Sequence, residues 1–150
     1  MASPAAVELT DIPQMDVGAP MPLVLAGDST LRLSFLLRDG GSALMAFDRA
    51  IHHSFGGPND EVLHGHPFYA AGLQPYAACE ILHSPLIASL EKIHSVHARH
   101  DPARFSALRH FVFTFHDAMF ECVARAYGVT ISEAELDGER FDEMRAALEI

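Results

Sequence analysis

The segment RHFVFTFHDAMFECVARAY, residues 109–127, constrains the fold more than any other part of this sequence. Phe111, Phe113 and Phe115 alternate with other residues, and a period of two is that of a β-strand with one buried face. A second apolar run follows His116-Asp117, so the segment predicts an antiparallel β-hairpin that turns there. We expect the phenylalanine side chains in the hydrophobic core.

The opposite face of this predicted hairpin carries titratable side chains. His110, Thr114 and His116 share that face with Val112, because side chains two residues apart point the same way. Glu121 joins them from the second strand, opposite Val112 or, if the turn lies one residue later, opposite Thr114. A carboxylate beside an imidazole orients the ring and tunes its proton affinity, which suits acid–base chemistry or polar ligand binding. The alternative is a solvated face with one ordinary ion pair.

Length and local pattern predict one α+β domain. The chain has 150 residues, of which 49% are hydrophobic, so it can bury a substantial core. Residues 1–20 are rich in proline and alanine and predict a flexible N-terminal arm. Residues 21–131 are expected to form the domain, and residues 132–150 a C-terminal helix. The expected architecture is one antiparallel sheet of five to six strands with one or two short helices on one face.

Four strands are expected outside the hairpin, three of them before a long loop. Segment 22–55 contains turn signals at Gly-Asp-Ser and Asp-Gly-Gly, and residues 31–38 alternate between apolar and polar side chains. Residues 45–55 read as a single strand, because their apolar side chains share one face. Residues 76–83 predict a further short strand after the loop.

Capping residues mark the expected helix starts. Ser84-Pro85 and Asp101-Pro102 each place a side-chain acceptor before a proline at the first helical position, where the missing N–H costs nothing. The residues Ser132-x-x-Glu135 predict a capping box that opens the C-terminal helix. Met144 and Leu148 recur at helical spacing, so we expect that helix to pack on the domain or on a partner.

The long loop, roughly residues 56–76, contains most of FGGPNDEVLHGHPFY. Loops longer than about 12–15 residues are uncommon in compact domains and are often functional. Its glycines permit unusual backbone angles and its prolines stiffen the chain, so polar side chains can be held in place. We expect this loop to cap one end of the sheet and to offer Asn59, Asp60 and Glu61 to a ligand. The alternative is a well-packed loop without chemistry.

The His64-Gly65-His66 step offers two imidazoles to one divalent metal. A cupin-like site would place a carboxylate four residues after the second histidine, where this chain has Ala70. A metal held by His64 and His66 therefore requires a carboxylate that folding brings in, from Asp60, Glu61 or Glu80. No nucleotide-binding or flavin-binding motif is present, so a divalent metal is the one cofactor that the sequence raises.

Charge and missing motifs exclude several classes of protein. Ten Lys and Arg against twenty Asp and Glu give a net charge of -10, which repels nucleic acid and anionic membrane surfaces. The sequence has no P-loop, G-x-G-x-x-G or G-x-S-x-G motif. Cys79 and Cys122 form no C-x-x-C and are expected to be buried thiols. With neither a signal-peptide pattern nor a membrane-length apolar run, the expected location is the cytoplasm.

Several segments carry a resemblance to a known family. FGGPNDE with the following GHP, the run SVHARHDPARFSALRHFVFTFHD, and FECVA together are similar to a family of small, uncharacterised bacterial proteins. The resemblance implies common descent over roughly residues 20–127 and implies no particular activity. This chain departs from the family pattern at His64, where the family has serine, and at Ala118 and Met119, where it has serine and threonine. The matching positions are Asn59, Asp60, Glu61, His66, His116, Asp117 and Glu121.

Two functions follow as hypotheses. In the first, His66 and His116 are acid–base or ligand-binding groups and Glu121 orients one of them. The loop residues named above and Asp117 would then bind a small polar metabolite, and the protein would be a small isomerase, lyase or hydrolase. In the second, the protein is a non-catalytic binding or accessory protein, expected to form a homo-oligomer and to meet partners through its C-terminal helix.

Overall fold

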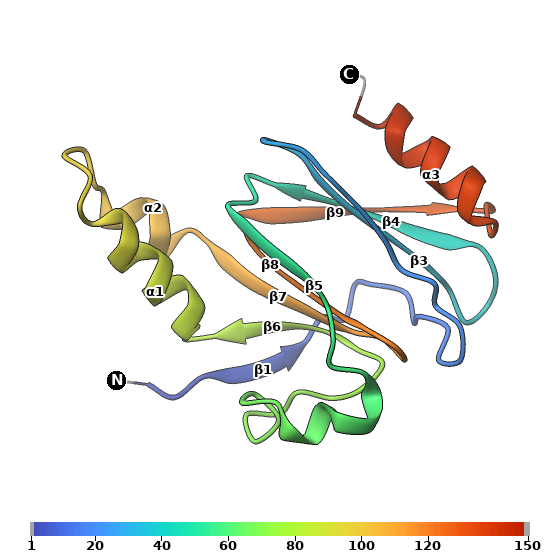
Figure 1. The fold of residues 1–150 in the computed structure, drawn as a ribbon, viewed down its shortest axis with the longest axis horizontal. Coiled ribbons are helices and arrows are strands. Elements are labelled where there is room, and N and C mark those ends of the chain that lie inside the picture. The colour runs from blue at the N-terminus through green and yellow to red at the C-terminus, as the bar shows by residue number, and fades with distance from the viewer. Residues whose placement is uncertain (1, 149–150) are drawn as a thin grey trace.

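Two antiparallel sheets form the framework in the computed structural model, which describes residues 2–148 (Figure 1). The five-stranded sheet has the order β1 (Ala5–Glu8), β6 (Ala78–Leu82), β7 (Arg109–Thr114), β8 (Met119–Ala124) and β5 (His52–Gly56). The four-stranded sheet has the order β2 (Leu23–Ala26), β3 (Leu31–Leu36), β4 (Ser42–Asp48) and β9 (Ala126–Ser132). The helices are α1 (Pro85–His94), α2 (Pro102–Ser106), α3 (Asp137–Ala146) and the 3-10 helix η1 (Asp60–Gly65).

The hydrophobic core lies between the two sheets. Phe111, Phe113 and Phe120 of the five-stranded sheet are fully buried, and Phe113 meets Phe47 of β4 edge to face with ring centroids 6.1 Å apart. Phe35 of β3 packs on the same cluster. The prediction that the alternating phenylalanines form the core is confirmed, because one face of each strand turns towards the other sheet.

The predicted hairpin is confirmed as β7 and β8. Val112 pairs with Glu121 and Phe113 with Phe120, which is the register expected for a turn at His116-Asp117. Glu121 therefore lies on the face away from the phenylalanine core. We call the core-facing side of the five-stranded sheet its inner face and the opposite side its outer face.

The expectation of a single sheet is wrong, because the chain between residues 22 and 56 forms four strands shared between two sheets. The predicted strand 45–55 breaks at Arg49, whose φ of 53° lies in the left-handed region that side chains other than glycine rarely adopt. The chain there leaves β4 in one sheet and enters β5 at the edge of the other. Ile51 and Phe55 are consequently half exposed and do not share the burial of Met45.

Both chain ends differ from their predicted form. Residues 5–8 of the predicted N-terminal arm form β1, which pairs with β6 at the edge of the five-stranded sheet. At the other end, α3 begins at Asp137, so the predicted capping box is wrong: Ser132 Oγ instead accepts from the Ala134 N–H, and Glu135 accepts from Gly41. Residues 1, 149 and 150, the extremes of the predicted arm and C-terminal helix, lie outside the described residues.

The predicted loop and the helix α1 both lie against the five-stranded sheet. Leu63 of η1 and Leu73 are buried on the outer face against an apolar group of strand residues, namely Cys79, Ile81, Val112 and Met119. The loop thus covers part of this face instead of only capping the end of the sheet. Ser84 and Asp101 cap α1 and α2 as predicted, accepting from the Ile87 and Ala103 N–H groups. No helix within residues 2–148 is long and apolar enough to cross a membrane.

Candidate functional site

The outer face of the five-stranded sheet brings polar side chains from several elements together. Glu121 of β8 lies beside Ser54 of β5 in the strand register, and His110 of β7 lies one pair further along the same face. His110 and Glu121 are diagonal neighbours, a separation that long side chains can span. The face therefore offers an imidazole and a carboxylate at a fixed spacing set by two central strands.

One hydrogen-bonded chain links these residues, and we call Ser54, Ser84, His110 and Glu121 the His110 network. The Nε2 atom of His110 lies 2.8 Å from Glu121 Oε2, and its Nδ1 atom lies 2.7 Å from Ser84 Oγ. The Ser54 hydroxyl donates to Glu121 Oε1 over 3.1 Å. The His110 side chain is fully buried, whereas 21% of the Glu121 side chain remains exposed. Solvent or a ligand can therefore reach the carboxylate but not the imidazole.

The protonation state of Glu121 sets the direction of the hydrogen bonds. The hydrogen bond from His110, with a further one from Ser54, lowers the pKa of Glu121 despite its partial burial. The ionised carboxylate accepts the Nε2 proton of His110. In neutral His110, Nδ1 then accepts the hydroxyl proton of Ser84. The network thus runs as carboxylate, imidazole and hydroxyl in sequence, an order that can move a proton along its length.

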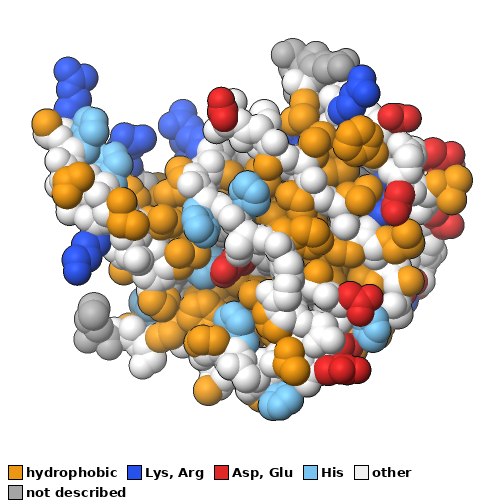
Figure 2. Space-filling model, viewed as in Figure 1, with side chains coloured by type: hydrophobic (Ala, Val, Ile, Leu, Met, Phe, Trp, Pro, Cys, Tyr) orange, Lys and Arg blue, Asp and Glu red, His pale blue; other side chains and the backbone are white. Residues whose placement is uncertain are grey.

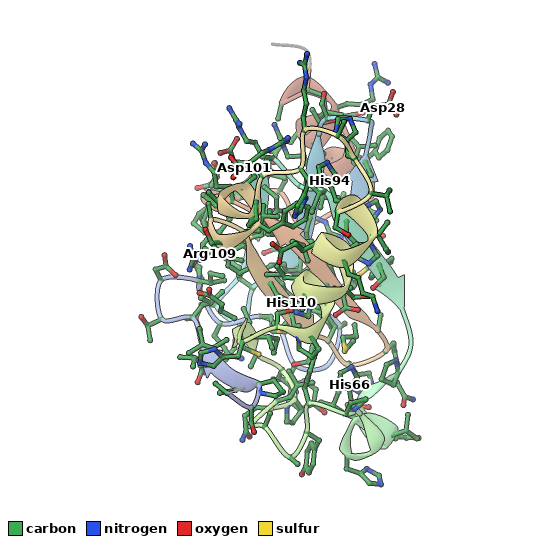
Figure 3. The ribbon with its side chains drawn as sticks, turned by 90° about the vertical axis from the view of Figure 1, so that its left-hand side faces the viewer. Asp28, His66, His94, Asp101, Arg109 and His110 are labelled. Carbon is green, nitrogen blue, oxygen red and sulfur yellow. The ribbon has the colours of Figure 1, made fainter. Side chains whose placement is uncertain are left out.

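Helix α1 holds Ser84 in place. Ser84 is the N-cap of that helix, and its Oγ accepts the Ile87 N–H over 3.1 Å. The same hydroxyl can donate to His110 because an N-cap oxygen uses only its acceptor lone pairs on the helix. Figure 3 shows His110 behind α1, with His66 on the loop below it. The start of α1 is therefore tied to the centre of the sheet.

His66 approaches the same network from the loop. Its Nδ1 atom accepts the backbone N–H of Phe68 over 3.0 Å, so neutral His66 carries its proton on Nε2. The ring of Phe68 packs against both imidazoles, with its centroid 5.3 Å from that of His66 and 5.8 Å from that of His110. Burial lowers the pKa of His66, with Glu121 opposing and His110 adding to that shift. At neutral pH this residue is an uncharged hydrogen-bond donor.

A second imidazole–carboxylate pair joins the loop to the hairpin turn. His116 Nδ1 lies 2.8 Å from Asp60 Oδ2, and the Tyr76 hydroxyl donates to the same oxygen. The Asp60 N–H also donates to the His116 carbonyl over 3.0 Å. The tyrosine hydrogen bond is the largest cause of a lowered pKa for Asp60, although burial opposes it. These contacts fix the loop on the turn.

The predicted site residues therefore divide between two places. His66 and Glu121 belong to the outer-face site, whereas His116 pairs with Asp60 at the hairpin turn. Glu121 bonds to His110 and not to His116. Asp117 lies on the exposed side of the turn, with its Oδ1 3.7 Å from His116 Nε2. The remaining loop candidates, Asn59 and Glu61, flank Asp60: Asn59 is the N-cap position of η1 without a side-chain capping bond, and Glu61 is exposed.

The two histidines of the predicted metal site have different surroundings. His64 is exposed with its ring 6.5 Å from that of Tyr69, whereas His66 is partly buried, with its ring 5.3 Å from that of Phe68. Within residues 2–148 no three His, Cys, Asp or Glu side chains group in the way that holds a metal ion. A metal held by His64 and His66 stays a prediction, and this chain offers it no third ligand from the described residues.

Two members of the site were not predicted. Ser84 was expected only to cap a helix, and nothing in its local sequence indicates that its hydroxyl also meets a histidine 26 residues later. The predicted strand 45–55 breaks at Arg49, so its pattern does not indicate that Ser54 pairs with Glu121. His110 was expected on the polar face. Its complete burial depends on cover from α1 and from Phe68, which local pattern cannot reveal.

Comparisons with known proteins add no assignment at this point. No protein-family model, no curated protein and no solved structure matches this chain significantly. The resemblance of the FGGPNDE, HFVFTFHD and FECVA segments to small bacterial proteins therefore stays a prediction.

Proposed function

We propose that this protein binds a small polar metabolite on the outer face of its five-stranded sheet and acts on it by general acid–base chemistry. The observation that carries the proposal is the buried imidazole of His110, held between Glu121 at 2.8 Å and Ser84 at 2.7 Å. A fully buried histidine with both nitrogens engaged by a carboxylate and a hydroxyl has a defined tautomer and orientation. These are the properties that a proton relay requires, and because a ligand cannot reach the buried imidazole, protons would pass to and from it through Glu121 or Ser84.

Each residue of the site has a distinct role in this proposal. Glu121 is the anion that holds the proton of His110 on Nε2 and presents its exposed edge to the ligand. His66 donates from Nε2, which has no hydrogen-bond partner among residues 2–148. Ser84 supplies a hydroxyl that can pass its proton to His110 Nδ1 as its oxygen takes up a proton from the ligand, so that the hydroxyl is restored. The Asp60–His116–Tyr76 cluster lies at the hairpin turn. It fixes the loop that carries His66 on that turn, so its role is to position His66.

The ligand is defined by the groups it must satisfy. Glu121 is ionised and accepts hydrogen bonds, so the ligand carries a hydroxyl or amine donor. Neutral His66 donates, so the ligand carries a carbonyl, carboxylate or hydroxyl oxygen a few ångströms away. Small hydroxy acids, amino acids and polyols combine such groups. The partial exposure of Glu121 favours a small molecule over a macromolecular substrate.

A binding screen with a matched pair of variants tests this proposal. Wild type, His66→Ala and His64→Ala would be screened by thermal shift against hydroxy acids, amino acids and polyols, because the two histidines sit on one loop with different surroundings. At least one ligand is expected to stabilise wild type and His64→Ala while binding His66→Ala about tenfold more weakly. Equal binding by all three proteins would contradict the proposal, and so would a screen without a ligand.

One observation favours the second hypothesis, a non-catalytic binding or accessory protein. Ser54, Glu121, His110 and Ser84 satisfy one another, so the network can also be read as the connection that fixes α1 on the sheet. That reading leaves His66 without a ligand-binding role. It also predicts that Ser84→Ala lowers stability with no effect on any ligand, which separates it from the acid–base proposal. An assembly of several copies remains part of this second proposal.

A further inference from the structure

A cavity of about 410 Å³ lies away from the His110 network, beneath the arm formed by α1 and α2. Its walls come from the second half of α1, from α2 and the segment after it, and from the chain crossings between the two sheets. None of the predicted site residues lines it. The lining residues are Arg49, Ile51, Leu90, Ile93, His94, Arg104, Phe105, Ala107, Leu108 and Arg125, and we call it the arginine cavity.

The arginine cavity has an apolar interior that continues to the surface. No residue of α1 is buried, and Ile93 is 68% exposed at the cavity wall. Ile51 on the opposite wall is 50% exposed. Contiguous exposed apolar side chains around a hollow are typical of a binding site, and cavities of about 300–1,000 Å³ commonly hold small molecules.

The charge around this cavity is opposite to that of the whole chain. The protein has ten Lys and Arg against twenty Asp and Glu, yet three arginines and no acidic residue line the cavity. Figure 2 shows basic and histidine side chains gathered on the side of the molecule that carries the α1–α2 arm. An acidic protein that concentrates positive charge at one apolar hollow offers a local site for an anion.

The arginines are available to a ligand. Among residues 2–148, Arg49 and Arg104 have no ion-pair partner. Arg125 lies 3.4 Å from Asp48, in a pair in which both side chains are about half exposed. Such exposed pairs contribute at most about 1 kcal/mol, so a ligand can compete for the guanidinium.

The arginines, and not the histidine at its wall, give the arginine cavity its charge. Arg49 occupies the left-handed region, with a φ of 53°, and this turn carries the chain from one sheet to the other beside the cavity. His94 is joined to His100 through their Nδ1 atoms, 2.9 Å apart. Burial is the largest cause of a lowered pKa for His94, and neighbouring His100, His97 and Arg104 lower it further. The cavity's positive charge at neutral pH therefore resides on the arginines.

We propose that the arginine cavity binds an amphiphilic carboxylate, an organic acid whose hydrocarbon part lies against Leu90, Ile93 and Phe105. Its carboxylate would meet Arg49, Arg104 or Arg125 at the rim. The planar guanidinium matches the two oxygens of a carboxylate in a bidentate pair, which favours this head group. This site is separate from the acid–base site, although α1 borders both: its first residue adjoins Ser84, and its last turn lines the cavity.

Calorimetric titration with octanoate, octanol and octylammonium tests the proposal, because these ligands share a chain length and differ in charge. We expect wild type to bind octanoate at least tenfold more tightly than octanol, and octylammonium the most weakly. Equal affinity for all three would overturn the assignment, since it would show an apolar hollow without charge selection. Octyl phosphate binding more than tenfold tighter than octanoate would overturn the choice of carboxylate.

Matched arginine variants locate the bound head group. Arg49→Gln and Arg104→Gln alter exposed side chains without ion pairs, so both proteins are expected to fold, and the double variant should bind octanoate at least tenfold more weakly. Arg38→Gln is the control, because Arg38 is exposed on the β3–β4 turn, pairs with Asp39 and does not line the cavity. Unchanged octanoate affinity in the double variant, or an equal loss in Arg38→Gln, would overturn the proposal.

Discussion

The inner and outer faces of the five-stranded sheet are built from alternate residues of the same strands, yet they are stabilised in different ways. On the inner face Phe111, Phe113 and Phe120 pack against the second sheet and need no specific partner atom. On the outer face, burial of His110 and Glu121 is tolerated only because their side-chain nitrogens and oxygens form hydrogen bonds with particular neighbours. The inner face therefore supplies stability, and the outer face combines a smaller stability with chemical specificity.

The largest expected effect comes from truncating the inner face. Phe113→Ala removes a fully buried ring that contacts Phe35, Phe47 and Phe120, so it should lower the free energy of unfolding by about 3–5 kcal/mol. Urea unfolding followed by circular dichroism measures this change. A loss below about 1 kcal/mol would show that the sheets do not pack as described.

Removing the buried imidazole of the outer face should have the next largest effect. His110→Ala leaves Glu121 and Ser84 without their shared partner, so we expect a loss of about 2–3 kcal/mol in unfolding free energy. His52→Ala is the matched control, because His52 lies in the same cross-strand row, paired with Val123, and makes no hydrogen bond through its ring among residues 2–148. Similar losses in both variants would show that His110 stabilises the fold through the packing of its side chain and not through its hydrogen bonds.

The outer face should also make stability depend on pH. The folded protein lowers the pKa of Glu121, so this group stabilises the fold at neutral pH, and the contribution is lost as pH falls from roughly 4 through the lowered pKa. Glu121→Gln has no ionisation at this position and should show a shallower decline of stability on acidification. Urea midpoints measured from pH 7 to pH 3 give the comparison. Parallel curves for the two proteins would contradict an ionised Glu121 in the network.

Ser84 and Ser54 permit a smaller and sharper comparison within the network. Ser84→Ala removes both the cap of α1 and the hydrogen bond that the Ser84 hydroxyl donates to His110, so we expect a loss of about 1 kcal/mol. Ser54 is exposed on the edge strand β5, and Ser54→Ala should cost less than about 0.5 kcal/mol. Chemical denaturation of both variants checks whether Ser84→Ala lowers the unfolding free energy more than Ser54→Ala. A larger loss in Ser54→Ala would show that the network is anchored at the sheet edge.

His66→Ala should also have a small effect on stability. His66 accepts one backbone hydrogen bond within its own loop, so its removal is expected to change the unfolding free energy by less than about 1 kcal/mol. Its effect on ligand binding should nevertheless be large under the proposed function. A thermal-shift measurement without ligand gives the unfolding temperature of the variant. A decrease of many degrees relative to wild type would show that His66 maintains the structure of the loop.

Local pattern predicted the inner face well and the outer face only in part. The alternation of Phe111, Phe113 and Phe115 is a local signal, so the hairpin and its core face followed from it, whereas the choice between the two predicted registers came from the structure. The same rule placed His110 and Glu121 together. It could not reveal that Ser84 completes their network, since that contact depends on how α1 crosses the sheet.

The errors share one cause. The break at Arg49 is a backbone conformation that residue type does not favour, so the division into two sheets could not be read from periodicity. The capping-box pattern at residues 132–135 is a valid local signal, but tertiary contacts took both of its side chains. Likewise, His116 turned to Asp60 because the loop docks on the turn, a contact between residues 56 positions apart.

The most direct test of the proposed site is a histidine-selective NMR titration with any ligand found in the polar metabolite screen. The ring signals would be assigned by single His→Gln substitutions, so each histidine reports on its own surroundings. We predict that the ligand shifts the signals of His66 and His110. The signals of His64, which is exposed on the loop, and of His94, which lines the arginine cavity, should stay unchanged. Shifts confined to His94, or to none of these histidines, would contradict a ligand site on the outer face.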